Sequence, residues 1–181
     1  MNSPTQNGKK TLIILALVFI LPVAAAKLVL SLDLYHGGAT NQGVLMPTDI
    51  SYQSLSMANP QPHLWQVIYL LPNQCDQQCK DRLYILHQSH IALGKDQDRV
   101  NTLIMTQKDS DIRAIAEFNF TTATANDALA SLLLQHQMII VDPLGSLIMR
   151  YEAVSGHQAQ LKQGKALVSD LRKMLKLSRI G

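Results

Sequence analysis

Cys75 and Cys79 are the only cysteines among the 181 residues of this chain. They follow a short apolar run, and their four-residue spacing places both sulfurs on one face of a helix, one turn apart. The Cα atoms of such a pair are roughly 6 Å apart, a distance that a disulfide can bridge with little backbone movement. In the reduced state the pair offers two soft thiolates to one metal ion. Disulfide exchange, metal binding and a purely structural disulfide are therefore the chemistries to weigh.

The N-terminal region indicates the compartment in which this pair works. Residues 11–26 carry no charge, with Lys9 and Lys10 in front and Lys27 behind. A bilayer core needs about 20 apolar residues, and the run reaches that length if Lys27 extends its amine to the interface. The lysine pair predicts a cytoplasmic N-terminus. We expect an uncleaved anchor, and the alternative is a signal peptide cleaved behind the alanines 24–26. Both interpretations, anchor and signal peptide, place the cysteines in an oxidising compartment.

Glycines and prolines mark the segment after the anchor. Residues 32–62 show little apolar periodicity and contain several turn signals, which predicts an extended tether. The remaining length is enough for one domain. The expected division is a cytoplasmic tail at 1–10, a transmembrane anchor at 11–31, a tether at 32–62 and one folded domain at 63–181.

The folded part predicts alternating strands and helices. Apolar runs rich in β-formers indicate strands, and apolar steps of three and four residues indicate helices. The expected strands are 65–71, 100–106, 137–141 and 146–151, and the expected helices are 76–93, 110–118, 126–135 and 158–178. The order β-α-β-α-β-β-α, with a cysteine pair at the first strand-to-helix junction, predicts an α/β fold of the thioredoxin-like class with one N-terminal transmembrane helix.

That junction favours one cysteine as the nucleophile. The positive end of a helix dipole and its free backbone N–H groups stabilise a thiolate. Cys75 is expected at the tip as the exposed sulfur, and Cys79 one turn deeper as the resolving thiol. With an added imidazole, the same geometry suits a monovalent copper ion, because soft thiolates select it over harder metals.

These features resemble the Sco/SenC proteins, membrane-anchored thioredoxin-like factors for cytochrome c oxidase assembly that carry a CxxxC pair and a distal histidine. The resemblance covers most of residues 60–178 and rests on the anchor, the cysteine pair, LGKD (93–96) and IVDPLG (140–145). GGATNQG (37–43) and VDPLG with MRY (141–151) are similar to small Sco-like proteins associated with bacterial oxidase genes. The prolines that flank the cysteines in typical members are replaced by Asp76 and Lys80. The resemblance implies that both cysteines are catalytic thiols and metal ligands.

His136 is the candidate third copper ligand that the resemblance implies. The position that matches the family's histidine is Leu134, and His136 lies two residues further on. That offset keeps the same face of an extended chain but shifts the imidazole by roughly 7 Å. A histidine hydrogen-bonded near the sheet is the alternative. His87 and His90 lie too far along the cysteine helix to share its metal and are expected at the surface or in packing.

Charge is unevenly distributed along the chain. The net charge is +3, of which residues 158–181 carry +5 and the rest −2. On an amphipathic helix this usually means a solvated basic face, and contact with a membrane surface or an acidic partner is the alternative. The sequence contains no phosphate loop or hydrolase triad, and we expect no nucleic-acid partner outside the cytoplasm.

Three function classes follow from these features. The first is a Sco-like factor of the bacterial inner membrane with its domain in the periplasm. It would assist copper-site assembly, by delivering Cu+ or by reducing thiols, together with a cytochrome c oxidase subunit or its copper-insertion machinery. The second is an enzyme, a membrane-tethered thiol–disulfide oxidoreductase without a cofactor. The third is an anchored interaction domain in which the fold is only a scaffold.

Overall fold

The computed structural model describes residues 5–31, 41–135 and 138–178. The chain forms two compact units, Met1–Thr40 and Asn41–Gly181. In the first unit, α1 runs from Thr5 to Ser31 and contains an apolar stretch of 22 residues, Gly8–Val29, with no part buried. At 1.5 Å per residue this stretch is about 33 Å long, enough to cross a hydrocarbon core of about 30 Å. A membrane anchor and a signal sequence both have this form.

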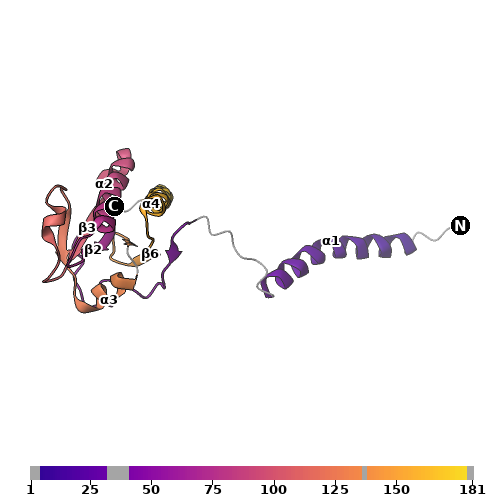
Figure 1. Ribbon diagram of the computed structural model, residues 1–181. Helices are drawn as coiled ribbons and strands as arrows, with labels where there is room; N and C mark the ends of the chain where they lie inside the picture. Colours follow the sequence, from indigo (N-terminus) through magenta and orange to yellow (C-terminus); the bar gives the residue numbers. More distant parts are fainter. Residues whose placement is uncertain (1–4, 32–40, 136–137, 179–181) are drawn as a thin grey trace. The chain divides into compact units, whose positions relative to one another are not determined.

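The second unit is built on a six-stranded sheet with the order β1-β6-β5-β2-β3-β4 (Figure 1). The strands are β1 (Val44–Leu45), β2 (Trp65–Leu70), β3 (Val100–Thr106), β4 (Thr121–Thr124), β5 (Met138–Val141) and β6 (Leu147–Tyr151). Strands β2, β3 and β4 are parallel, whereas β5, β6 and β1 continue the sheet on the other side of β2 in antiparallel pairs. All six residues of β2 are buried, because the strand is central and both of its faces are covered.

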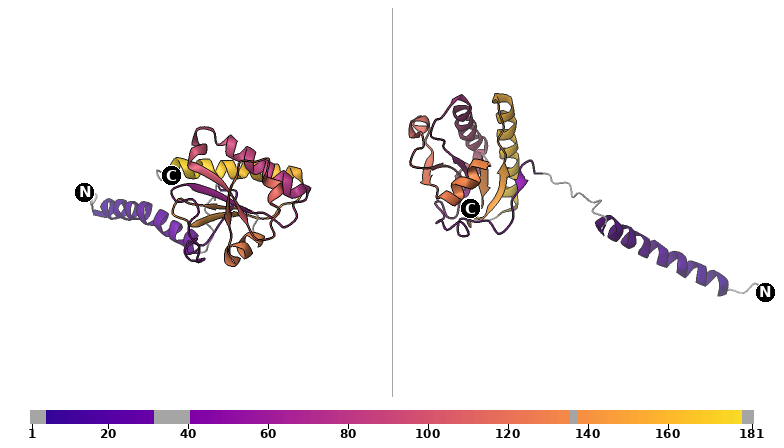
Figure 2. Two further views of the ribbon diagram at one scale, coloured as in Figure 1. Left: turned by 90° about the vertical axis from the view of Figure 1, so that its left-hand side faces the viewer. Right: turned by 60° about the horizontal axis from the view of Figure 1, so that its bottom comes forward.

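Helices cover both faces of this sheet (Figure 2). Helices α2 (Gln77–Ala92) and α4 (His157–Leu177) lie side by side over one face, and α3 (Asp127–Gln135) lies over the other. The alternation of side chains along β2 matches this layering, since Val67 and Tyr69 pack with α2 and α4 while Ile68 and Leu70 pack with α3. Two short 3₁₀ helices, η1 (Gly94–Arg99) and η2 (Ile112–Ile115), complete the domain.

The predicted thioredoxin-like α/β arrangement is confirmed, with one helix predicted wrongly and two strands, β1 and β4, missed. The helix predicted at 110–118 is wrong, because only the four residues of η2 are helical there. Of the two missed strands, β4 lies at the edge of the sheet and pairs with β3. Its residues alternate between half-buried and exposed and consist of three threonines and an alanine. Such a strand shows no apolar run, so the periodicity of the sequence does not reveal it.

The tether predicted at 32–62 is also wrong in extent, because residues 41–62 belong to the domain. β1 pairs with the edge of β6, and Met46 is buried in the core. The ring of Tyr52 is buried as well, and its hydroxyl donates a hydrogen bond to Oε1 of Gln66 over 2.8 Å. Gly43 runs so close to β6 that a Cβ there would lie 2.5 Å from the side chain of Met149. This segment packs through isolated side chains and has no repeating pattern.

Candidate functional site

The two cysteines form a disulfide at the junction between β2 and α2, with their Cα atoms 5.2 Å apart. The predicted helix is confirmed as α2, but Cys75 lies outside it, before the cap residue Asp76. Cys79 is the third residue of the helix. The pair is therefore held by a loop on one side and by the first helical turn on the other.

Asp76 determines where the helix begins. Its backbone is extended and its carboxylate accepts a hydrogen bond from the backbone N–H of Cys79 over 2.9 Å. An aspartate in this position satisfies one of the N–H groups that a helix leaves open at its start. The N–H group of Cys79 is thus bonded to a carboxylate and is not available to a thiolate.

The two sulfur-bearing residues differ in exposure. Cys75 is half-buried at the rim of the core, whereas Cys79 is 6% exposed and packs inside the core that α2 and α4 form with the sheet. A partner molecule reaches Cys75 more easily than Cys79. The preference for Cys75 as the nucleophile, derived from the sequence, stays a prediction.

Asp111 is a second carboxylate beside Cys75, and sequence reasoning missed it. Its Oδ2 accepts from the backbone N–H of Cys75 over 3.4 Å, and its own N–H donates to the carbonyl of Pro72 over 2.9 Å. The neighbouring hydroxyl of Ser110 donates to the carbonyl of Leu71 over 2.7 Å. A signal was present, because Asp111 follows the carboxyl end of β3, next to the carboxyl end of β2 where the cysteines lie.

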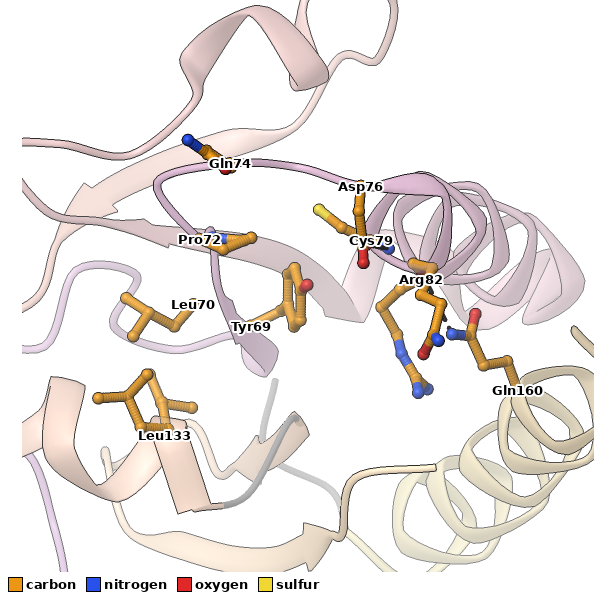
Figure 3. Close-up of a pocket in the computed structure, with 11 residues that line it drawn as sticks. Tyr69, Leu70, Pro72, Gln74, Asp76, Cys79, Arg82, Leu133 and Gln160 are labelled. Atoms are coloured by element: carbon orange, nitrogen blue, oxygen red, sulfur yellow. Dashed lines mark hydrogen bonds between the residues drawn. The ribbon is translucent and has the colours of Figure 1, made fainter. Parts of the chain in front are cut away.

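A cavity of about 270 Å³ lies next to Cys79 (Figure 3). Tyr69 from β2, Arg82 from α2 and Gln160 from α4 converge on it, and Leu133 from α3 closes one side. Gln160 is 2% exposed and ties α4 to the start of α2, because its Nε2 donates to the carbonyl of Gln78 over 3.1 Å. The cavity therefore joins the disulfide to three layers of the fold.

Arg82 brings a buried positive charge to this cavity. Its side chain is 1% exposed and donates to Oε1 of Gln163 and, over 3.5 Å, to the carbonyl of Val154. Burial lowers the pKa of the Arg82 guanidinium. Burial also raises the pKa of the Tyr69 hydroxyl to about 12, and the charge of Arg82 acts in the opposite direction.

The position of Arg82 in the sequence indicates that its side chain lies near Cys79. It follows Cys79 by three residues, which places the two side chains on neighbouring turns of one helix face. That face is otherwise apolar, with Leu83 and Leu86 in the core. Arg82 and Cys79 thus line the same cavity, while the carboxylates of Asp76 and Asp111 accept from the backbone N–H groups of Cys79 and Cys75.

The candidate third ligand, His136, lies outside the described residues. The described residues on either side of it border the site, since Leu133 and Leu134 line the cavity and Sδ of Met138 lies 3.9 Å from Nη1 of Arg82. His87 packs against aromatic rings, with its ring centroid 5.5 Å from that of Phe118, which confirms its predicted packing role.

Copper is the metal that the Sco-like resemblance implies, and the donors near the disulfide decide how well it fits. In the described part of the chain, no three His, Cys, Asp or Glu side chains gather as a metal site. After reduction, the two thiolates alone suit a monovalent copper ion with two ligands. Asp76 and Asp111 offer hard oxygen donors, which suit other metals better. The described donors thus fit copper only in the reduced state and with two ligands.

Fold and site together define a thioredoxin-like domain with a close cysteine pair at its first strand-to-helix junction. The chain belongs to the family of transmembrane-like, thioredoxin-like C-terminal domains, which matches residues 65–178. Among curated proteins none matches it significantly.

Solved structures with a similar fold include Sco1 proteins and a peroxiredoxin. Apo Sco1 from Thermus thermophilus is 15% identical with a TM-score of 0.48, over 76% of this chain and 99% of that chain. Yeast Sco1 with copper bound is 15% identical with a TM-score of 0.47, over 64% of this chain and 80% of that chain. Xanthomonas campestris peroxiredoxin Q is 15% identical with a TM-score of 0.46, over 64% of this chain and 82% of that chain. Identities this low carry no function from these proteins to this chain.

Proposed function

We propose that this protein is a membrane-anchored thiol–disulfide reductase that acts on cysteines of an exported partner during assembly of the copper site of cytochrome c oxidase. The observation that carries the proposal is the disulfide between half-buried Cys75 and buried Cys79 at the start of α2. One sulfur is open to a partner, and the other is held one bond away, ready to resolve the reaction.

The reaction runs in two exchanges, starting from the reduced pair. The Cys75 thiolate attacks one sulfur of the partner's disulfide, a mixed disulfide forms, and the partner's other sulfur leaves as a thiolate that takes up a proton. The Cys79 thiolate then attacks Sγ of Cys75 and releases the partner's second thiol. Two electrons pass to the partner, and this chain ends with the Cys75–Cys79 disulfide. Arg82 lines the cavity beside Cys79, and its positive charge would favour the thiolate needed for the second exchange.

Charges near Cys75 support the reducing direction. A pair becomes a strong oxidant when its reduced form is stabilised. Here the carboxylate of Asp111 accepts from the backbone N–H of Cys75 and that of Asp76 from the backbone N–H of Cys79, so two negative charges at the site oppose a further one on sulfur. The disulfide is therefore favoured over the thiolate form. We expect a reduction potential near or below that of thioredoxin, about −270 mV.

Two features support an oxidase copper site as the target. The stretches 37–43 and 140–145 resemble Sco-like proteins associated with oxidase genes, and α1 has the length and composition of a membrane anchor. Soft thiolates bind copper, whereas the corresponding disulfide contains no thiolate to bind it. A cysteine-containing copper site in an oxidising compartment therefore needs a reductant before the metal enters.

Copper delivery is the second candidate, and one observation favours it. The residues that flank His136 border the cavity beside Cys79, namely Leu133 and Leu134 before it and Met138, in contact with Arg82, after it. His136 lies between these residues in the sequence, and we propose it as the third ligand of the reduced pair. Three ligands of this kind suit Cu+.

A deletion strain distinguishes these roles. We expect it to assemble oxidase with less copper and to recover when a small exported thiol reductant is supplied or when the wild-type gene is returned. The Cys75→Ser/Cys79→Ser variant should not restore assembly. Recovery with added copper and not with the thiol would favour delivery over reduction. Normal oxidase copper content in the deletion strain would refute the oxidase link and leave a general membrane-tethered oxidoreductase.

A further inference from the structure

The exposed face of α4 is basic along one line. Lys162, Lys165, Arg172 and Lys176 are exposed, and at 3.6 residues per turn they lie within an arc of roughly 80°. The only acidic residue of this helix, Asp170, is fully buried. We call these four residues the basic stripe. No carboxylate on the same helix faces solvent to neutralise it.

An apolar groove borders the stripe. It lies between α2 and α4, has a volume of about 730 Å³, and opens where Gly164 lets the two helices approach closely. A Cβ on Gly164 would lie 2.6 Å from Cγ2 of Ile85. On the α2 side Tyr84 lines the groove and is 53% exposed. Exposed apolar side chains next to a row of basic ones form the kind of surface that lies in a membrane interface.

Charge selects the occupant of this surface. Basic side chains close to an anionic membrane contribute about 1 kcal/mol each, and the four of the stripe act on the same side of one helix. The guanidinium of Arg172 also donates to the carbonyl of Ala92, which holds it across the end of the groove. Tyrosine is enriched where a protein meets the headgroup region of a bilayer. The exposed side chain of Tyr84 would lie in that region if the groove faced a membrane.

The chain also limits how far the domain can move from a membrane that holds α1. The first residues of the domain are bonded to α4, because the backbone N–H groups of Gln42 and Gly43 donate to Oδ2 of Asp170 over 2.8 and 2.9 Å. Nine residues lie between Ser31 and Asn41, and the ten Cα-to-Cα steps of a fully extended chain over that stretch span at most about 36 Å. A weak surface contact is then formed at high effective concentration.

We propose that the basic stripe and the α2–α4 groove dock on anionic phospholipid headgroups of the membrane that anchors the chain. Tyr84 follows Cys79 by five residues on α2, a rise of about 8 Å. Docking would hold the disulfide near the membrane surface, within reach of a membrane-embedded partner. The inference does not depend on whether that partner is an oxidase.

The test uses the full-length protein in nanodiscs of phosphatidylcholine alone or with 30 mol% (about one third) phosphatidylglycerol, a composition chosen to supply negative surface charge. A fluorescent label is placed at Gln88→Cys in the groove and, as a control, at Ala128→Cys on α3, with the native disulfide left oxidised. Lipids with a nitroxide on the headgroup report contact by quenching. We expect the groove label to be quenched at least twofold more in the anionic discs, and the α3 label to show no such difference.

Charge variants identify the cause of the quenching. Lys162→Gln/Lys165→Gln/Lys176→Gln should reduce quenching of the groove label to the level in neutral discs. The matched control Lys95→Gln/Lys108→Gln/Arg113→Gln removes as many exposed charges elsewhere and should leave it unchanged. Salt at 0.5 M should act like the stripe variant (roughly 4 Å of screening length remains). Equal quenching in both lipids, or no quenching in either, would overturn the proposal and leave the groove for a protein partner.

Discussion

The carboxylate of Asp76 accepts a hydrogen bond from the backbone N–H of Cys79, 2.9 Å away, so a negative charge lies between the two cysteines in the sequence and caps the helix that carries one of them. In a site that activates a thiolate, the helix start stabilises the sulfur. Here the cap is an aspartate, and we expect its negative charge to favour the disulfide over the thiolate form of the pair.

Asp76→Asn should raise the reduction potential of the pair. Asparagine caps a helix about as well as aspartate, so the fold is kept while the negative charge is lost. We expect an increase of about 20 mV, the scale of one exposed charge at close range in a two-electron couple. Equilibration with a thiol buffer followed by alkylation and mass measurement gives the potential. Asp98→Asn, which removes an exposed charge in η1 beyond the C-terminal end of α2, should leave the potential unchanged. An unchanged potential in Asp76→Asn would refute the electrostatic argument.

Cys75 should be alkylated before Cys79 in the reduced protein at neutral pH. Cys75 is half-buried at the rim of the core, whereas Cys79 is within it. We expect at least a tenfold difference in rate, because reagent access limits the buried thiol (an order-of-magnitude expectation). Peptide mapping after brief labelling measures it. Faster labelling of Cys79 would show that the Arg82 cation outweighs access and would reverse the two roles in the exchange.

Asp170→Asn should loosen the N-terminal edge of the domain. Oδ2 of Asp170 accepts from the N–H groups of Gln42 and Gly43 and, over 2.9 Å, from the hydroxyl of Tyr151. Asparagine has only one oxygen acceptor, and its NH₂ group would face some of the N–H and O–H groups that now donate to Asp170. We expect a loss of about 3 kcal/mol in the free energy of unfolding. Denaturant unfolding and hydrogen exchange at 42–46 measure the effect. Asp109→Asn, in an exposed loop, is the control. Equal stability of the two variants would show that the hydrogen bonds to Asp170 contribute nothing to stability.

His136→Ala should weaken copper binding to the reduced protein if copper delivery is the function. Removing one of three soft or borderline ligands leaves two thiolates and should lower the affinity for Cu+ at least tenfold (about 1.4 kcal/mol). Competition with a chromophoric Cu+ chelator measures it, and unchanged circular dichroism confirms the fold. His90→Ala is the matched control, because His90 lies near the end of α2, away from the cysteines. Its Nε2 is 3.2 Å from the carbonyl of Gln97 in η1. Equal affinities in wild type and His136→Ala would leave thiol reduction as the remaining role.

Local patterns in the sequence were enough to predict the anchor-like helix, the central strand and the cysteine helix. The uncharged run at 11–26 exceeds what a soluble helix carries on its surface, and β2 is apolar because both of its faces are covered. Asp76 starts a helix in which apolar residues recur at three- and four-residue steps. Each of these signals is contained within a few turns of chain.

The tertiary structure alone decided what surrounds the disulfide. Asp111 reaches Cys75 across 36 residues, and Gln160 reaches the start of α2 across 82. The segment 41–46 docks on β6 and α4 through a few backbone groups and single buried side chains. Contacts of this kind leave no periodic trace, because each depends on one residue meeting a partner brought close by the fold. The thiol chemistry was therefore visible in the spacing of Cys75 and Cys79, whereas the charges that bias it became visible only once the strands and helices were packed.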